Sequence, residues 1–260
     1  MTKYSLPLIL VLFVGFASCK KSSDTPSVPP VTTLPGSPNL TNASGAFYAI
    51  VIDALLKNGS GYDTTTINTP MAWFESTSQS KDAGTASCNA APLVLKDTFF
   101  GTPFNNTWYT LKTDYTFTGT PLNFKGTSSI VWKASGNSAN AIPAINFSDN
   151  NPFGKITGFV VPSSITYGTG GLNVSFNFSN STGTDQLLYL IKGSKDQKAG
   201  SLTLSTTTLS LTAAEVSSLG VKGDQLEVEL IPVKISSSVI GGKTYYFVKE
   251  YCINKYVDLL

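Results

Sequence analysis

The chain has 260 residues, a formal net charge of +2 and no histidine, and every basic residue is a lysine. The missing histidine excludes Ser-His-Asp and Cys-His catalysis and most zinc, copper and non-haem iron sites, while the missing arginine excludes bidentate clamps on phosphate or carboxylate groups. A net charge so near zero does not supply the basic surface that binds nucleic acid, so we expect no nucleic-acid partner. We also expect no metal and no cofactor.

The first 18 residues have the pattern of an export signal. Lys3 gives a positive start, and the apolar run over residues 6–16 is about half as long as the ~20 residues that a membrane-spanning helix needs. Two small residues before Cys19 suit a signal peptidase. We therefore interpret residues 1–18 as a cleaved leader and not as a permanent anchor.

The cysteine at the expected cleavage point indicates a particular class of leader. Residues 16–19 have the sequence Phe-Ala-Ser-Cys, which resembles the lipobox of bacterial lipoproteins, although Phe16 replaces the usual leucine. The resemblance implies that the mature protein begins at Cys19 and that Cys19 carries the lipid anchor, including palmitate. An ordinary secretory leader, cut at another small residue, is the alternative.

A proline-rich segment follows the expected anchor. Residues 19–45 contain five prolines, a composition that neither continues a helix nor buries a core. We expect an extended tether of about 3 Å per residue that holds the folded part away from the membrane. Lys20 differs from the aspartate that leads an inner-membrane retention signal. This difference favours placement in the outer membrane, facing the periplasm or the cell surface.

From residue 46 onward the pattern is that of β-strands. Threonine, serine, valine, tyrosine and phenylalanine dominate, and clusters of turn residues separate the apolar runs. In the first half, strands are expected at 47–56, 71–76, 93–99, 108–112, 115–118 and 129–133. Residues 148–152 are a strong loop signal, which predicts two domains at 46–150 and 151–260.

Apolar and polar residues alternate more clearly in the second half. Glu227 and Glu229 alternate with leucine and valine, which predicts that one face of this strand packs and that the glutamates lie on the wet face. Pro232 interrupts the same run and predicts an edge position or a bulge. Further strands are expected at 172–178, 187–191, 202–204, 209–211 and 244–257.

Residues 212–220 supply the one clear helical signal. Thr212 and Glu215 have the spacing of a capping box, and Gly220 ends the helix after two turns. Strands at intervals of about 10 to 15 residues around one short helix predict an all-β fold, with one or two immunoglobulin-like antiparallel β-sandwiches. The Cys-Trp-Cys spacing of antibody domains is missing, so the likeness concerns architecture alone.

Several features occur together in this chain: the lipobox, the proline-rich tether, strands around Trp73 and Trp132, and the closing segment at 242–247. In this combination the sequence resembles uncharacterised envelope lipoproteins of Gram-negative bacteria with immunoglobulin-like β-sandwich domains. The shared motifs are structural and include no catalytic residue. The resemblance therefore implies no activity.

Two cysteines remain once Cys19 is acylated. Cys88 and Cys252 would lie in an oxidising compartment, where an even number of cysteines suggests a disulfide between distant parts of the chain. A disulfide needs Cα atoms about 4.4–6.8 Å apart, and sequence does not show this distance. Two buried thiols are therefore an equal alternative.

Adjacent aromatic residues are the leading candidates for ligand binding. Trp73 and Phe74, and likewise Trp108 and Tyr109, lie in expected strands, where neighbours point to opposite faces. If one ring of each pair fills the core, the other faces outward and could stack on a sugar ring or anchor a partner protein. The opposing interpretation is that loops or a second sheet cover these rings.

Carboxylates are the remaining candidates for acid–base catalysis. Glu75 and Asp97 lie near aromatic residues, and glycan hydrolysis needs two carboxyl groups roughly 5–9.5 Å apart. The Asp-Asn-Asn turn at 149–151 offers oxygen ligands for calcium but lacks the spacing of an EF-hand. We expect a non-enzymatic lipoprotein with a binding or scaffolding role in the cell envelope, whose partners are the membrane and a glycan or an envelope protein. A carbohydrate-binding accessory protein and a carboxylate-based glycan hydrolase are the alternatives.

Overall fold

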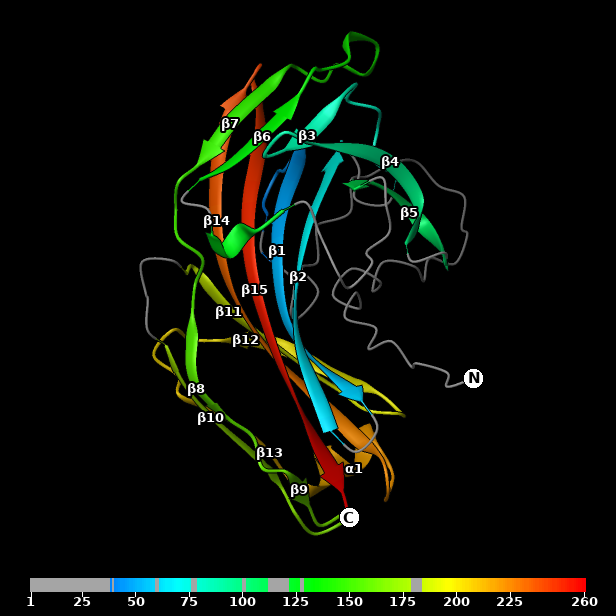
Figure 1. Ribbon diagram of the computed structural model, residues 1–260, viewed down its shortest axis with the longest axis vertical. Helices are drawn as coiled ribbons and strands as arrows, with labels where there is room; N and C mark the ends of the chain where they lie inside the picture. Colours follow the sequence, from blue (N-terminus) through cyan, green and yellow to red (C-terminus); the bar gives the residue numbers. More distant parts are fainter. Residues whose placement is uncertain are drawn as a thin grey trace.

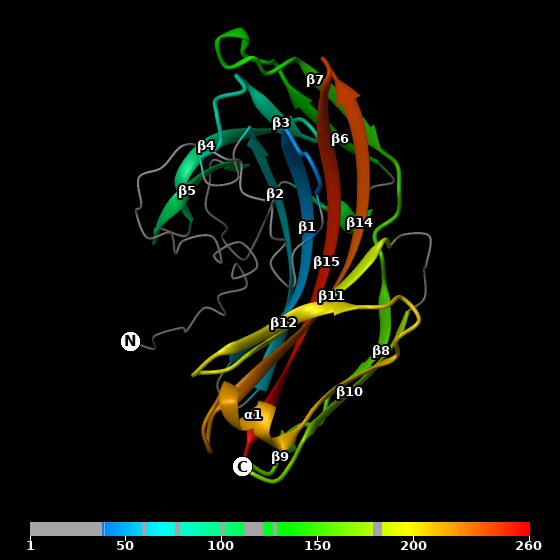
Figure 2. The same ribbon diagram turned by 180° about the vertical axis from the view of Figure 1, so that it is seen from behind.

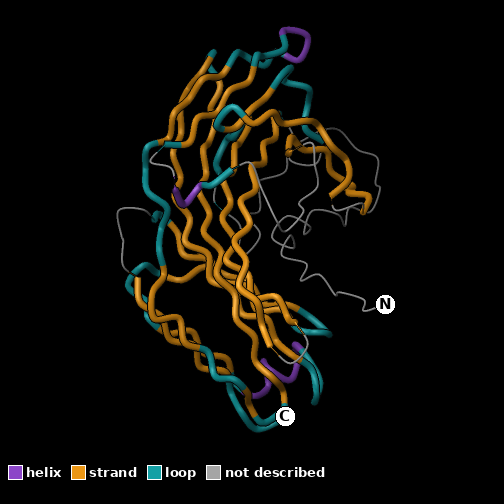
Figure 3. Tube along the Cα trace, in the orientation of Figure 1, coloured by secondary structure: helices purple, strands orange, loops and turns teal. Residues whose placement is uncertain are grey.

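A computed structural model of the chain describes residues 38, 40–58, 61–75, 79–99, 102–111, 122–126, 129–178 and 184–260. Within these residues the molecule consists of strands, a single α-helix and two short 3-10 helices, which confirms the expected all-β fold with one short helix (Figure 3). The expected signal peptide, Cys19 and most of the expected tether lie outside the described residues. No helix in the described part is long and apolar enough to cross a membrane.

Strands follow one another along the chain with few interruptions. The first half holds β1 (Gly45–Asn58), β2 (Gly61–Phe74), β3 (Ala86–Cys88), β4 (Ala91–Phe99), β5 (Thr102–Leu111), η2 (Phe124–Gly126), β6 (Ile130–Ala134), η3 (Ser138–Asn140) and β7 (Ile145–Asp149). The second half holds β8 (Ile156–Val160), β9 (Ser164–Ile165), β10 (Leu172–Phe178), β11 (Gln186–Lys192), β12 (Gln197–Leu202), β13 (Thr208–Leu211), α1 (Ala213–Leu219), β14 (Gln225–Ile240) and β15 (Lys243–Leu259). The strand expected at 115–118 lies outside the described residues.

Four long strands, β1, β2, β14 and β15, run along the length of the molecule (Figure 1). They belong to a sheet with the order β12-β11-β14-β15-β1-β2-β5-β4-β3-β6-β7, to which β9 is added through β15. The first and last long strands pair in parallel, from Gly45 beside Tyr245 to Asp53 beside Ile253. The sheet therefore contains strands from both sides of residue 150, where the sequence predicts a domain boundary.

The sheet curls back over itself in the upper half of Figure 1 and encloses a core there. The ring of Phe247 on β15 stacks between Phe47 of β1, with centroids 5.0 Å apart, and Phe147 of β7, at 3.7 Å. Trp132 of β6, which is 1 % exposed, also packs on Phe47. This upper core consists mainly of Phe47, Val51, Phe74, Cys88, Tyr109, Phe124, Trp132, Ile145, Tyr245 and Phe247.

A separate sheet of three strands, β13-β10-β8, covers the lower half of the long strands (Figures 1 and 2). Leu172, Val174 and Phe176 of β10 point inward, while the residues between them are exposed, as the alternation predicts. The lower core consists mainly of Ile156, Phe159, Leu172, Val174, Phe176, Leu187, Ile191, Leu211, Val216, Leu226, Val228, Leu230, Val257 and Leu259. The upper and lower cores therefore share the long strands β14 and β15.

The opposite face of the long strands carries a third apolar cluster, formed by Ala46, Tyr48, Ile50, Ile52, Met71, Trp73, Trp108, Leu188, Ile231, Val233, Val248 and Cys252. These residues come from β1, β2, β5, β11, β14 and β15. Side chains on this face alternate with those that fill the upper and lower cores, because successive residues of a strand point to opposite sides of the sheet. Both faces of the long strands are thus buried.

The short helix α1 lies at the lower end of the molecule, near the C-terminus (Figure 2). Its capping box is confirmed: Glu215 N donates to Thr212 Oγ1 at 3.3 Å, and Thr212 N donates to Glu215 Oε2 at 2.8 Å. The helix ends at Gly220, as predicted.

The strand that contains Pro232 is not at an edge. β14 lies between β11 and β15. Leu230 pairs with Ile253 of β15 and Val233 pairs with Glu250, so the register of the two strands does not shift across Pro232. Residues 231 and 232 have no partner in β15, so a gap in the ladder accommodates a residue that has no N–H to donate.

Candidate functional site

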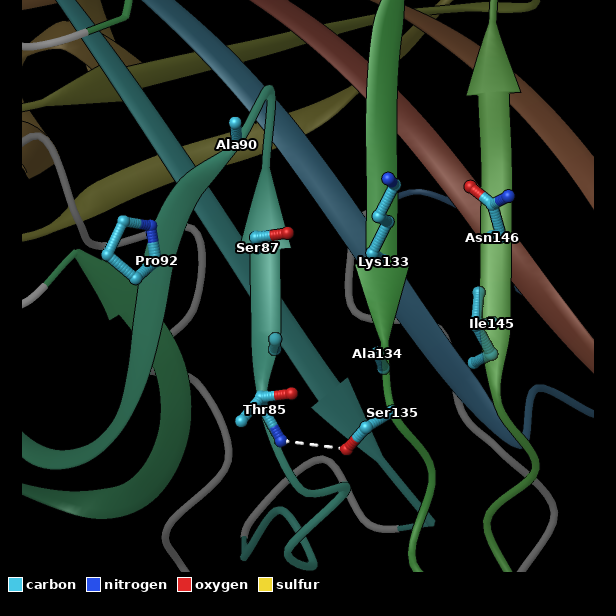
Figure 4. A pocket seen from close by; sticks show the side chains of 10 residues that line it. Thr85, Ser87, Ala90, Pro92, Lys133, Ala134, Ser135, Ile145 and Asn146 are labelled. Atoms are coloured by element: carbon cyan, nitrogen blue, oxygen red, sulfur yellow. Dashed lines mark hydrogen bonds between the residues drawn. The ribbon is translucent and has the colours of Figure 1, made fainter.

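A groove of about 460 Å³ lies on the outer face of β3, β6 and β7 (Figure 4). Both apolar and polar residues line it, and we call it the polar groove after its hydroxyl, amide and ammonium groups. This is within the size range of small-ligand sites. Its lining residues are Thr85, Ala86, Ser87, Ala90, Pro92, Lys133, Ala134, Ser135, Ile145 and Asn146. The groove lies on the side of these strands that faces away from the upper core.

Strand alternation explains which side chains line the polar groove. Trp132 and Ala134 of β6 point into the upper core, so Lys133 between them points outward. The same alternation exposes Asn146 on β7 and turns Ser87 on β3 away from the core. The groove offers hydroxyl, amide and ammonium groups to a ligand, and its lining residues include no carboxylate.

Two hydrogen bonds between Thr85 and Ser135 join the segments that flank β3 and β6 at one end of the polar groove, and one of them is the bond from Ser135 N to the Thr85 carbonyl at 2.9 Å. Thr85 N donates to Ser135 Oγ at 3.0 Å, as the dashed line in Figure 4 shows. The strands themselves are joined by the antiparallel pairs of Ala86 with Ala134 and of Ser87 with Lys133. Ser87, Lys133 and Asn146 therefore stand on paired strands, whereas Thr85 and Ser135 lie directly beside the strand ends.

The four aromatic candidates for ligand binding are all buried. Trp73 and Trp108 are each 4 % exposed and belong to the third apolar cluster, whereas Phe74 and Tyr109 belong to the upper core and are at most 2 % exposed. Phe74 and Tyr109 meet edge to face at 5.5 Å, and the Tyr109 hydroxyl donates to Asp82 Oδ1 at 2.8 Å. The expectation of one outward ring in each pair is wrong, because both faces of the sheet are covered at β2 and β5.

The two described cysteines are free thiols. Cys88 packs into the upper core, whereas Cys252 belongs to the cluster on the opposite face of the long strands. The predicted disulfide is therefore wrong, and the alternative of two buried thiols is confirmed. Burial raises the pKa of both thiols, and for Cys252 the neighbouring glutamates add to this effect, so neither side chain is a ready nucleophile.

Three glutamates are buried around Cys252. Glu229 is 1 % exposed, Glu250 is 4 % exposed and Glu227 is 6 % exposed; we call these three residues the acidic cluster. The expectation of a wet face for Glu227 and Glu229 is wrong, because the third apolar cluster occupies that face of β14 and β15. Alternation in the sequence separated the two faces of the strand correctly but did not indicate that both of them are buried.

Glu227 is held by hydrogen bonds, whereas burial raises the pKa of Glu229 and Glu250. Glu227 Oε1 accepts hydrogen bonds from Asn254 Nδ2 at 2.7 Å and the Tyr256 hydroxyl at 3.3 Å, and the Cys252 thiol lies 3.6 Å from Glu229 Oε2. Burial raises the pKa of Glu250 to about 7. Burial, with a smaller effect from the charge of Glu227, raises the pKa of the Glu229 carboxyl well above its ordinary range.

Of the two carboxylates that the sequence singles out, the structure describes the side chain of Glu75 alone. Glu75 accepts a hydrogen bond from Lys243 Nζ at 2.6 Å and is held in an ion pair. The side chain of Asp97 lies outside the described residues. The expectation of a carboxyl pair at these two positions therefore stays a prediction.

The ammonium group of Lys249 occupies the turn at 149–151, which the sequence offers as a possible calcium site. Lys249 Nζ donates to the backbone carbonyl of Asp149 at 3.0 Å and to that of Asn151, and it lies 3.5 Å from Asp149 Oδ1. Burial lowers the pKa of Lys249, and the charge of Asp149 opposes this shift. In the part of the chain that the structure describes, no group of three or more acidic or cysteine side chains is placed to hold a metal ion.

A second charged network surrounds Asp53 on β1. Asp53 accepts hydrogen bonds from Thr66 Oγ1 at 2.6 Å, from Lys125 Nζ at 2.6 Å and from the Tyr251 hydroxyl. Burial works to raise the pKa of Asp53, but these hydrogen bonds outweigh it and lower the pKa. Lys125 Nζ also lies 5.1 Å above the Tyr251 ring. Each polar group here is engaged by another, which is typical of a structural network.

No protein-family model and no curated protein matches this chain. The resemblance to envelope lipoproteins therefore stays a prediction from sequence. The described residues present an open polar groove on one layer and a buried acidic cluster on the other side of the long strands. The groove is open to solvent, whereas the acidic cluster is enclosed.

Proposed function

We propose that this chain is a lipid-anchored, non-catalytic binding protein of the bacterial outer membrane that uses the polar groove to bind a hydroxyl- or carboxylate-bearing ligand of the glycan class. The observation that carries the proposal is the groove itself, in which Lys133, Ser87 and Asn146 project from paired strands. Lys133 makes no ion pair with a carboxylate among the described residues, so its ammonium is available to a ligand.

The burial of the acidic cluster supports a binding role over hydrolysis. A general acid or base must come within hydrogen-bond reach of the substrate proton that it transfers. Glu227, Glu229 and Glu250 are at most 6 % exposed, so a bulky substrate such as a glycan does not reach them. The polar groove holds hydrogen-bond donors and acceptors but no acidic side chain, a composition that favours recognition without chemistry.

Replacing Lys133 with glutamate tests the polar groove. We expect the full chain, purified in detergent, to bind selected glycans on an array, and we expect the Lys133→Glu variant to bind at least about tenfold more weakly. One charge-assisted hydrogen bond contributes roughly 1.5–3 kcal/mol, and 1.4 kcal/mol corresponds to a factor of ten.

The matched control is Lys222→Glu, which makes the same charge change at an exposed lysine between α1 and β14. This variant should bind as the wild type does. A uniformly flat array for the wild-type chain, or equal losses in both variants, would refute a ligand site in the polar groove.

The lipid anchor has its own test. We expect Cys19→Ser to move the protein from the membrane fraction to the soluble fraction, because a thioether-linked lipid cannot form on serine. Fractionation with quantitative blotting measures this, and the wild-type protein should carry a fatty acid detectable by intact mass. Unchanged fractionation of the variant would contradict the anchoring half of the proposal without affecting the polar groove.

A further inference from the structure

The acidic cluster lies on the two longest strands that the structure describes, β14 and β15. In their antiparallel register, Glu229 lies beside Asn254 and Glu227 lies beside Tyr256. Glu250 is on β15, two residues before Cys252 and therefore on the same face of the sheet. All three glutamates act to raise the pKa of the Cys252 thiol, which places this thiol within electrostatic reach of the whole cluster.

Positive charge near the acidic cluster is scarce. From β11, Lys192 lies beside Glu227. From β1, Tyr48 faces Glu250, which helps to raise the pKa of this tyrosine. On β15, the row continues with Tyr256 and then with Asp258 at the strand end, while β2 contributes threonines, Met71 and Trp73. Among the described residues of these strands, Lys192 is the one cation on this face.

Burial makes ionisation of these groups costly. A carboxylate that leaves water without a compensating cation or several hydrogen-bond donors takes up a proton instead. Glu227 has donors in Asn254 and Tyr256, whereas Glu229 faces the Cys252 thiol, which is a weak donor. If all three glutamates were ionised, Lys192 would be the one described cation near three negative charges on this side of the sheet.

We propose that Glu229 and Glu250 of the acidic cluster form a pH-sensitive lock, in which their protonated carboxyl groups stay buried beside Cys252 and their ionisation draws water into this face and loosens the pairing of β14 with β15. The lock is a property of the long strands and is independent of the polar groove. Loss of glycan binding would leave it untouched.

The direction of the effect follows from proton linkage. The pKa of Glu250 is about 7 in the folded protein and near 4.5 in the unfolded chain. Between these values the folded state binds the extra proton, so stability falls as pH rises through this range. The folding equilibrium constant should decrease roughly 300-fold from this group across that window. For Glu229, whose folded pKa is raised further, the fall continues above neutral pH.

Unfolding of the full chain in detergent, followed in denaturant at pH 5 and at pH 8, measures the global effect. We expect the wild type to be less stable at pH 8, and we expect Glu229→Gln and Glu250→Gln to remove most of the difference. Asp196→Asn is the matched control, because its carboxyl group is exposed. A wild-type stability that stays level between the two pH values, or glutamine variants that keep the full difference, would overturn the lock.

Alkylation of the two buried cysteines measures the local effect. Cys88 lies in the upper core and serves as an internal reference for the ordinary rise of thiolate with pH. We expect the ratio of Cys252 to Cys88 labelling, read by peptide mass spectrometry, to rise at least about tenfold from pH 5.5 to pH 8. The ratio should stay constant in a Glu229→Gln/Glu250→Gln double variant. If the glutamine variants do not fold, the wild type decides the test. A Cys252-to-Cys88 labelling ratio that stays constant with pH would then reject the proposal, and a rising ratio would support it.

Discussion

Replacement of Phe247 by alanine is expected to lower the free energy of unfolding by about 3–5 kcal/mol, the range for loss of a large ring from a packed core. Phe247 is fully buried and stacks on Phe47 and Phe147 at centroid distances of 5.0 and 3.7 Å. Its ring joins the first strand, the last strand and β7, so the cavity would open between both layers of the upper core. Denaturant unfolding of the full chain measures the loss.

Two controls make the Phe247 result specific. Phe247→Leu keeps much of the apolar volume and should cost less than the alanine variant. Val239→Ala, at a side chain that is 70 % exposed, should change stability by less than about 0.5 kcal/mol. An alanine variant at position 247 that loses less than about 1 kcal/mol would show that the stack is not central to the upper core.

The second large effect is expected at Lys249. Lys249→Met should lower the free energy of unfolding by about 3–5 kcal/mol, because it leaves the buried Asp149 carboxylate without its cation. Both side chains are at most 3 % exposed, and the ammonium also satisfies the backbone carbonyls of Asp149 and Asn151. The interaction fixes the segment that leads from β7 to β8, where the chain passes from the upper core to the lower core.

A double variant separates the charge from the packing. Adding Asp149→Asn to Lys249→Met removes the orphaned carboxylate and should recover a substantial part of the lost stability. Lys234→Met is the matched control, since Lys234 pairs with Asp185 at 3.1 Å near the surface and should cost at most about 1 kcal/mol. No recovery in the double variant would mean that the ion pair is not what holds this segment.

Local patterns in the sequence predicted several elements well. The alternation over 172–178 corresponds to β10 (Leu172–Phe178), and the capping box of Thr212 corresponds to the start of α1. β2 was predicted too short, since it begins at Gly61 and not near residue 71. The threonine-rich run at its start is half polar and lacks the apolar face that marks a strand, but pairing with β1 makes it one.

The candidate sites were harder to predict than the strands. A polar groove made of serine, lysine and asparagine has no motif, because its residues come from three strands that meet only after folding. The acidic cluster had a signal in Glu227 and Glu229, but the usual rule that charged residues face water assigned them to the wrong environment. Glu250 and Cys252 join them only through the register of β14 with β15.

The amino-acid sequence by itself determined the class of the fold, because period-two patterning, threonine-rich composition and one capping box are local properties of the chain. Tertiary structure alone decided that both faces of the long strands are covered, that Cys88 and Cys252 lie apart, and that Lys249 binds the turn at 149–151. The physical reason is the parallel pairing of β1 with β15. This pairing joins the first and last described strands in one sheet. Burial of side chains on these strands then depends on contacts between residues about 200 positions apart, which no local pattern encodes.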